Sequence, residues 1–244
     1  MVSRTDEVVN GIKRMILEGS LRPGDRLPVE KDLAEMLNVS RGPLREGMSA
    51  LSILGIVNIR QGDGTYITDL DATQLLEPMG FVVDLQGQGD ARHIHTVRRL
   101  LECEAARLAA TRITNDALHQ TRQLLDEAAR IVGQTAQDHT RIIEIDIAFH
   151  RTIATHTDNP VLIGLIEAFA GRTVRERLWR SLHEDGADRR THEEHVAIWQ
   201  ALAAHDPERA RIRMANHLAG VEESLQGLPD HGDVLPEASR TAIP

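Results

Sequence analysis

The sequence has few of the residues that mark secreted, membrane-spanning or aromatic-rich proteins. Aromatic side chains make up only 2% of its 244 residues, so the core must consist mainly of aliphatic side chains, which favours packed helices over a β-sandwich. The one cysteine, Cys103, excludes a disulfide bond within the chain and is typical of a reducing compartment. No signal peptide opens the sequence, and no apolar run approaches membrane-spanning length. These absences predict a soluble, cytoplasmic protein with no membrane partner.

The sequence also lacks an excess of positive charge. It holds 28 basic and 37 acidic residues, a net charge of −9. Residues 1–70 hold nine basic and ten acidic residues, a net charge of −1, so the amino-terminal part is not basic either. Binding to a nucleic acid must therefore depend on where a few basic side chains lie. We expect such binding to need two copies of the chain and modest salt.

A helix suited to enter a DNA groove is predicted to begin at Ser40 and to end before Gly55. Ser40 is a suitable N-cap, and Pro43 falls in the first turn, where no N–H of the helix is lost. Arg41 and Arg45 are four residues apart and share one side near the start of the helix. The opposite, packing side is expected to consist of Leu44, Gly47, Leu51 and Leu54.

The flanking segments predict a winged helix-turn-helix. Upstream, an apolar stripe over residues 33–37 marks a short helix, and Asn38 and Val39 form a tight connection. Downstream, residues 56–60 and 65–67 are predicted to be strands joined by a tight turn. In this architecture the second helix enters the major groove and the wing lies along the backbone or the minor groove. The alternative is that the two arginines only solvate a helix.

Three motifs carry a family resemblance: GDRLPVEKDLA at residues 24–34, VSRGPLRE at 39–46 and GDGT at 62–65. Together they resemble the DNA-binding domain of the GntR family of bacterial transcription regulators. The resemblance implies five DNA-contacting residues, the last two of them contacts to the DNA backbone: Lys31, Arg41, Arg45, Ser40 and Gly62. Val29 stands where the family usually has a small hydroxyl residue, which removes a cap from the helix that starts near Glu30.

The predicted fold class is mainly α, with an amino-terminal winged helix-turn-helix, a small β wing and a carboxy-terminal antiparallel helical bundle. Short connections between the later helices favour the bundle. The predicted helices cover residues 5–19, 73–85, 93–111, 115–132, 137–156, 160–182, 188–204 and 207–225, with 191 as the other possible start of the helix that ends at 204. The predicted divisions are a DNA-binding domain over 1–70, a linker over 71–90, an all-α metal- and effector-binding domain over 91–227 and a disordered tail over 228–244.

Four polar residues fall on the apolar faces of three predicted helices. Asp146 and His150 are four residues apart on a core-facing stripe, while His195 and His217 lie on apolar stripes of the last two helices. A carboxylate buried with three imidazoles is costly unless a cation lies among them. A divalent metal ion would satisfy all four, with zinc expected and nickel or manganese as alternatives. The other interpretation is a hydrogen-bonded polar core without metal.

These four residues carry a second resemblance, together with the run Arg98-Arg99-Leu100-Leu101-Glu102. They are similar to the FCD ligand-binding domain of the FadR-type branch of the GntR family. The resemblance implies that Asp146, His150, His195 and His217 are metal ligands, and that Arg98 holds the carboxylate of a small organic acid effector. An anionic oxygen of the acid would occupy an open position on the metal, and Arg98 would bind its far end.

The function predicted from these patterns is a ligand-responsive transcription regulator and not an enzyme. A homodimer would match a near-palindromic DNA operator, and the effector would shift the spacing of the two DNA-reading helices. One alternative is a metal-dependent hydrolase or lyase, which needs a carboxylate base beside the metal. Glu194 is adjacent to His195 in the sequence but is not suited to that role, since adjacent residues point about 100° apart on a helix. The other is a metal-free acyl-ligand sensor of the same fold, for which four inward polar groups have no purpose.

Overall fold

The computed structural model describes residues 3–85, 91–134, 137–170 and 174–224. The predicted disordered tail over 228–244 therefore lies outside the described residues. The chain divides into two compact units, Met1–Pro78 and Met79–Pro244, and helix α4 (Ala72–Leu85) spans the boundary. The segment predicted as a linker thus contains the short helix expected there. The mainly helical fold class predicted from the sequence is confirmed.

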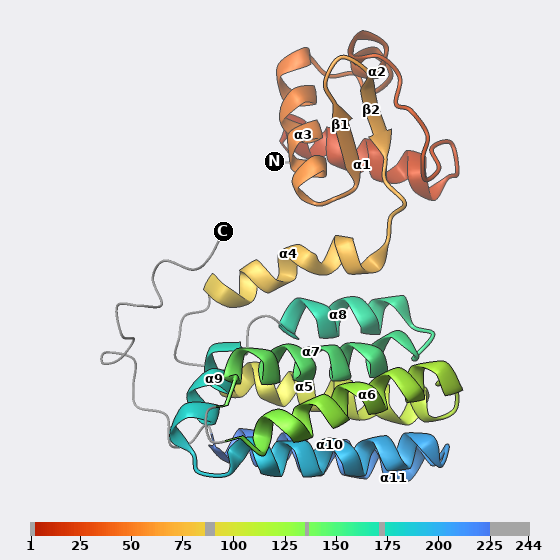
Figure 1. Cartoon of the computed structure of the whole chain (residues 1–244). Coiled ribbons are helices and arrows are strands. Elements are labelled where there is room, and N and C mark those ends of the chain that lie inside the picture. The colour runs from red at the N-terminus through yellow and green to blue at the C-terminus, as the bar shows by residue number, and fades with distance from the viewer. Residues whose placement is uncertain (1–2, 86–90, 135–136, 171–173, 225–244) are drawn as a thin grey trace. The chain divides into compact units, whose positions relative to one another are not determined.

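The amino-terminal unit is a winged helix-turn-helix (Figure 1). Its helices are α1 (Arg4–Leu17), α2 (Glu30–Met36) and α3 (Arg41–Ile53). Strands β1 (Val57–Arg60) and β2 (Gly64–Ile67) form an antiparallel hairpin, in which Val57 pairs with Ile67 and Arg60 with Gly64. The predicted helix, turn and wing therefore lie within one or two residues of their expected bounds.

Helix α3 is fixed by its packing against α1. Leu44 and Leu51 are buried against Val8 of α1, and a Cβ added at Gly47 would lie only 2.6 Å from Cγ1 of Val8. A side chain at this position would therefore force Val8 to shift. The prediction that Leu54 belongs to the packing side was wrong: Leu54 is 42% exposed, because α3 ends at Ile53 and the chain turns away.

The two helices that hold most of the predicted DNA-binding residues, α2 and α3, have no side-chain capping hydrogen bond at their amino-terminal ends. Ser40 has the extended backbone of an N-cap, but its side chain makes no capping hydrogen bond, which corrects the role predicted for it. Val29 precedes α2 and also provides no cap, as expected from its side chain. In contrast, Ser3 and Asp6 form a complete capping box at the start of α1. The Ser40 hydroxyl is thus exposed and is not used by its own helix.

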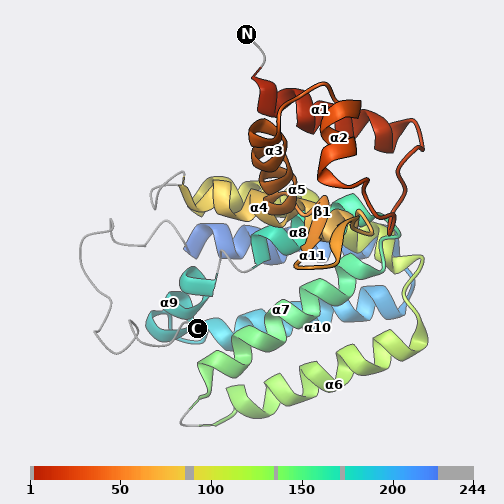
Figure 2. The same cartoon turned by 90° about the horizontal axis from the view of Figure 1, so that it is seen from above.

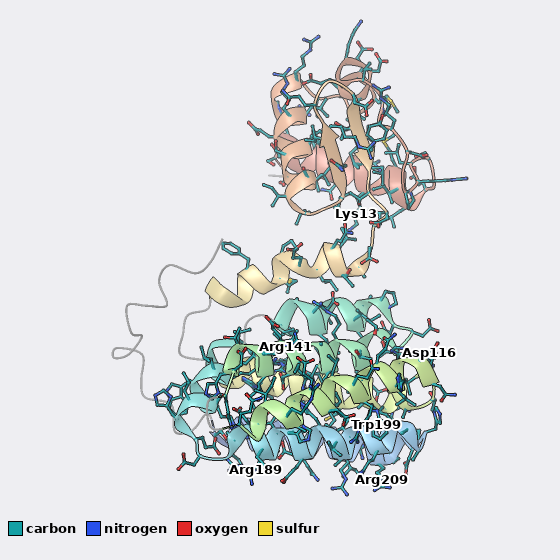
Figure 3. All side chains as sticks on the ribbon, in the orientation of Figure 1. Lys13, Asp116, Arg141, Arg189, Trp199 and Arg209 are labelled. Atoms are coloured by element: carbon teal, nitrogen blue, oxygen red, sulfur yellow. The ribbon has the colours of Figure 1, made fainter. Side chains whose placement is uncertain are left out.

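The carboxy-terminal unit is a helical bundle (Figures 1 and 2). Helix α5 packs against α7, α8 and α11, and α10 packs against α6 and α11. Its core is aliphatic except for a few side chains such as Phe149, and exposed residues such as Arg189 and Arg209 project from its outer surface (Figure 3). Its helices are α5 (Ala91–Ala110), α6 (Asn115–Val132), α7 (His139–Thr155), α8 (Pro160–Ala170), α9 (Val174–His183), α10 (Ala187–Ala203) and α11 (Pro207–Ser224).

One predicted helix is two helices in the structure. The sequence favoured a continuous helix over residues 160–182, whereas the structure has α8 and α9 on either side of residues 171–173, which lie outside the described residues. Both views place α9 at one end of the bundle, where it contacts α7 and α10 (Figures 1 and 2). Helix α9 therefore contributes side chains to that end. None of the described helices combines the length and apolar content needed to cross a lipid bilayer.

Candidate functional site

Helices α7, α10 and α11 bring the four predicted metal-ligating residues together. Each of Asp146, His150, His195 and His217 offers one possible ligand atom, and these atoms all lie within 4.8 Å of one another. Nε2 of His195 lies 3.4 Å from Nε2 of His217 and 3.4 Å from Oδ1 of Asp146. Nε2 of His150 lies 3.8 Å from the same Oδ1 atom. Three imidazole nitrogens and one carboxylate oxygen thus face a common point.

The cluster is almost completely shielded from solvent. The three imidazoles are between 2% and 4% exposed, while Asp146 is 13% exposed. Phe149 stacks on the His195 ring with a centroid distance of 4.3 Å, which limits the rotation of that ring. In such a dry environment each polar atom needs a partner, so the cluster is suited to hold a cation.

Two further carboxylates contact the Nδ1 atoms of two of these imidazoles, on the side of the ring away from Nε2. Nδ1 of His217 lies 2.8 Å from Oε2 of Glu194, and Nδ1 of His150 pairs with Oε2 of Glu102. An imidazole that donates its Nδ1 proton to a carboxylate presents the lone pair of Nε2 on the other side, and such pairing is usual for histidines that bind metals. Glu194, considered from the sequence only as a catalytic base, therefore orients His217. The role of Glu102 was not predicted.

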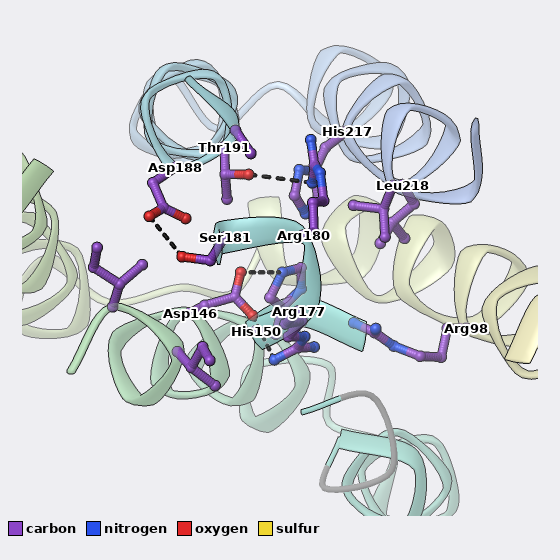
Figure 4. A pocket seen from close by; sticks show the side chains of 14 residues that line it. Arg98, Asp146, His150, Arg177, Arg180, Ser181, Asp188, Thr191, His217 and Leu218 are labelled. Atoms are coloured by element: carbon purple, nitrogen blue, oxygen red, sulfur yellow. Dashed lines mark hydrogen bonds and ion pairs between the residues drawn. The ribbon is translucent and has the colours of Figure 1, made fainter. Parts of the chain in front are cut away.

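Two arginines lie beside the cluster (Figure 4). Arg177 of α9 forms an ion pair with Oδ2 of Asp146, and Nε of Arg98 donates a hydrogen bond of 2.7 Å to Oε1 of Glu102. Arg98 lines the cavity next to the cluster, as its predicted effector-binding role requires, but part of its guanidinium already binds Glu102. Arg177 was missed because the position of α9 over the cluster is not apparent from local periodicity.

Burial and nearby charge set the protonation states of the cluster. Burial, reinforced by the neighbouring imidazoles, lowers the pKa of His217 to about 3 and that of His195 well below its ordinary value. Burial by itself would raise the pKa of Asp146, but Arg177 and the histidines outweigh burial and lower the pKa of that carboxyl. An ionised Asp146 carboxylate beside the neutral imidazoles of His195 and His217 is the state that binds a metal ion.

A further buried histidine lies on α5, one turn before Arg98. His95 is 1% exposed, and neither of its ring nitrogens has a hydrogen-bond partner among the described residues. Burial and the positive charges of Arg98 and Arg177 lower the pKa of His95 to about 3, so its imidazole is neutral. No local pattern separates His95 from the histidines of the chain that are surface residues or hydrogen-bonded members of a core.

The five residues predicted to contact DNA are all exposed on the amino-terminal unit. Nε and Nη2 of Arg45 both donate hydrogen bonds to the Glu30 carboxylate, the second at 3.1 Å. Gly62 lies in the turn of the wing with a φ of +78°, a conformation that favours glycine. The five residues come from α2, the start of α3 and the wing: Lys31, Ser40, Arg41, Arg45 and Gly62.

Comparisons with known proteins match both units. The family model "Bacterial regulatory proteins, gntR family" matches residues 4–67, and the "FCD domain" model matches residues 93–220. The chain is 34% identical over 218 residues to the HTH-type transcriptional regulator LutR of Bacillus subtilis (strain 168), which covers 87% of this chain and 97% of LutR. It is 30% identical over 233 residues to the Uxu operon transcriptional regulator of Escherichia coli (strain K12), covering 93% and 89% of the two chains. A solved structure described as Streptococcus agalactiae GntR matches with a TM-score of 0.63 at 26% sequence identity. The match covers 90% of this chain and 99% of that structure's chain.

Proposed function

Because this chain belongs to the GntR family of bacterial transcription regulators, we propose that its FCD domain binds a divalent metal ion and a small organic acid that changes operator binding. The chain is a DNA-binding regulator of the GntR/FCD type. The families and relatives that it matches are transcription regulators and not enzymes. The hydrolase or lyase considered from the sequence is therefore set aside.

Operator contact is assigned to the exposed residues of α3 and its neighbours. Arg41 and Arg45 at the start of α3 would reach base edges in the major groove, and Lys31 of α2 would also contact the DNA. Ser40 and Gly62 would contact the DNA backbone. The exposed hydroxyl of Ser40, which caps no helix, supports a contact of this kind. Glu30 directs the Arg45 guanidinium before DNA is bound. Two copies of this unit in a homodimer would read a near-palindromic operator.

The convergence of four ligand atoms within 4.8 Å is the observation that carries the metal proposal. Asp146, His150, His195 and His217 would be the ligands, and Glu102 and Glu194 would hold two of the imidazoles in position. One carboxylate and three imidazoles suit zinc, and nickel or manganese are the alternatives. A bound divalent ion would also offset the burial of the Asp146 charge.

The effector is proposed to bind in the cavity beside this cluster. Arg98 and Arg177 line that cavity, and a guanidinium binds a carboxylate through two parallel hydrogen bonds. A small acid placed there would meet the metal with one anionic oxygen and Arg98 with another. Because α9 covers the cavity and contacts α7 and α10, a bound acid would change how these helices pack. Such a change in a dimer would alter the spacing of the two DNA-reading helices.

The test measures metal, acid and DNA binding on the full chain. Elemental analysis of the purified protein is expected to give about one divalent ion per chain. Small carboxylates should raise the melting temperature of the metal-loaded protein but not of the chelator-treated protein, and they should change the affinity for an operator selected from random DNA. Sedimentation should give a dimer. Absence of metal even after dialysis against zinc, with equal acid binding before and after chelation, would refute the metal proposal. Stabilisation only by long acyl chains would favour the metal-free sensor.

A further inference from the structure

The wing carries a basic side chain that the assigned DNA contacts leave out. Arg60, the last residue of β1, is the one lysine or arginine between Arg45 and Arg92 in the sequence. The contact assigned to the wing is Gly62, which has neither a side chain nor a charge. Arg60 lies two residues before Gly62, at most about 7 Å along the chain. Its long side chain can therefore reach the same stretch of DNA backbone as Gly62.

The Arg60 guanidinium is held by groups of the wing itself (Figure 1). Its Cζ atom lies 4.5 Å from the centroid of the Tyr66 ring on β2, a cation–π contact. Nη1 of Arg60 lies 4.0 Å from Oδ2 of Asp63, and the Tyr66 hydroxyl donates a hydrogen bond of 3.1 Å to Oδ1 of Asp63. The ring and the carboxylate thus keep the guanidinium close to the wing turn.

The backbone of this turn is fixed from the other side by Arg26. Arg26 forms an antiparallel bridge with Tyr66, so it lies directly beside β2. Nη2 of Arg26 donates a hydrogen bond to the backbone carbonyl of Asp63. A Cβ added at Gly64 would lie 2.7 Å from Nε of Arg26, so the guanidinium packs directly on this glycine. Asp63 therefore has a defined position relative to Arg60 before DNA binds.

The contact between Arg60 and Asp63 is weak enough for a phosphate to replace it. Their side chains are 57% and 53% exposed, and the 4.0 Å between Nη1 and Oδ2 is longer than a hydrogen bond. Exposed ion pairs of this kind contribute little free energy. A DNA phosphate accepts two parallel N–H bonds from a guanidinium and releases its counterions. Because the Tyr66 ring covers only the face of the guanidinium, the N–H groups at its edge stay available.

We propose that Arg60 is a further DNA-contacting residue, which binds a backbone phosphate beside the wing, and that Asp63 competes with this phosphate for the guanidinium. Tyr66 keeps the guanidinium at the wing turn in both states. A phosphate contact carries no base readout, so Arg60 strengthens binding to the operator and to random DNA alike. The inference rests on the operator contacts proposed for α3 and Gly62, since these bring the wing to the DNA.

The first test measures the salt dependence of DNA binding by the full chain. Fluorescence anisotropy would give the association constant for an operator selected from random DNA and for a random duplex of equal length. Arg60→Ala should reduce the slope of log K against log salt by about 0.9 for each bound copy, and should weaken binding to both duplexes by a similar factor. Arg60→Lys keeps the charge and should restore the slope. Lys13→Ala, the same change of charge on α1, is the matched control and should keep the wild-type slope.

The outcomes of this test separate the inference from the proposed function. If Arg60→Ala keeps both the wild-type slope and a native circular dichroism spectrum, Arg60 is not a DNA contact, while the contacts proposed for α3 stand. If the wild-type chain binds neither duplex, the proposed operator contacts are overturned as well.

A second test concerns the competition by Asp63. Asp63→Asn removes the negative charge and keeps an oxygen that accepts the Tyr66 hydrogen bond. It should tighten binding to both duplexes by about two- to fivefold, the range of an exposed ion pair. Most of this gain should be lost in the double variant with Arg60→Ala, because the two residues then no longer interact. Glu18→Gln, at an exposed acid after α1, is the matched control and should change neither affinity. No gain from Asp63→Asn, or an equal gain with and without Arg60, would overturn the competition.

Discussion

Replacing Glu194 by alanine is expected to weaken metal binding without removing a ligand. The Glu194 carboxylate lies 2.8 Å from Nδ1 of His217, whose side chain is 2% exposed, so Glu194 orients this imidazole. Loss of such an outer partner typically lowers metal affinity by about 10- to 100-fold. This corresponds to about 1.4 to 2.7 kcal/mol of binding free energy. Glu194→Gln keeps an oxygen acceptor without the charge, so we expect an intermediate loss.

The assay is a zinc titration in competition with a chromophoric chelator at constant pH. Glu193→Ala is the matched control, because Glu193 is the adjacent acid and is exposed. It should bind zinc as tightly as the wild type. A Glu194→Ala variant that keeps wild-type zinc affinity within twofold, with the circular dichroism and melting temperature of a native fold, would refute this role of Glu194. If the wild type itself binds no zinc, nickel or manganese, the four inward residues form only a polar core.

Three more predictions concern the DNA-reading helix, its packing and the single thiol. Arg45→Ala should abolish specific operator binding in a mobility-shift assay while Lys13→Ala, a change of equal charge on α1, should not; equal loss by both would contradict the assigned contact. Gly47→Ala should destabilise the amino-terminal unit by about 1–3 kcal/mol in urea unfolding, since its methyl group overlaps a buried valine of α1, whereas Gly42→Ala has open space and should not. Burial raises the pKa of the Cys103 thiol to about 11, so alkylation of the native protein should stay slow at pH 8 and accelerate as pH rises toward 11. Because the neutral thiol is favoured by folding, its stabilising effect is present below about pH 9 and is lost as pH rises through 11; an alkylation rate at pH 8 equal to that of the unfolded chain would contradict this.

Local sequence patterns determined most of the secondary structure. The spacing of apolar residues and the capping signals gave α6 its observed bounds, and those of the other helices mostly within two residues. The paired glycines of the wing turn marked the hairpin correctly. Predictions from local capping and periodicity signals failed where contacts with the rest of the chain outweigh these signals. Ser40 has the backbone of an N-cap without its hydrogen bond, and the segment predicted as one helix over residues 160–182 holds two described helices, α8 and α9.

The four inward residues were also apparent from the sequence, because helical periodicity specifies which face of each helix is apolar. Asp146 and His150 are neighbours on one helix, so their proximity follows from helix geometry alone. The sequence further indicated that His195 and His217 point into the bundle. Their proximity to Asp146 depends on how α10 and α11 pack against α5 and α7. The short loops between the helices permit this packing but do not specify it.

Only the tertiary structure decided which groups surround the cluster. Glu102 of α5, Glu194 of α10 and Arg177 of α9 reach the four inward residues from three helices, and none belongs to a local motif with its partner. The physical reason is the separation along the chain between the residues that interact. Turn and helix signals arise from residues within four positions of one another, whereas these ion pairs and hydrogen bonds join residues between 23 and 48 positions apart. Their partners are fixed by the angles and offsets at which whole helices pack.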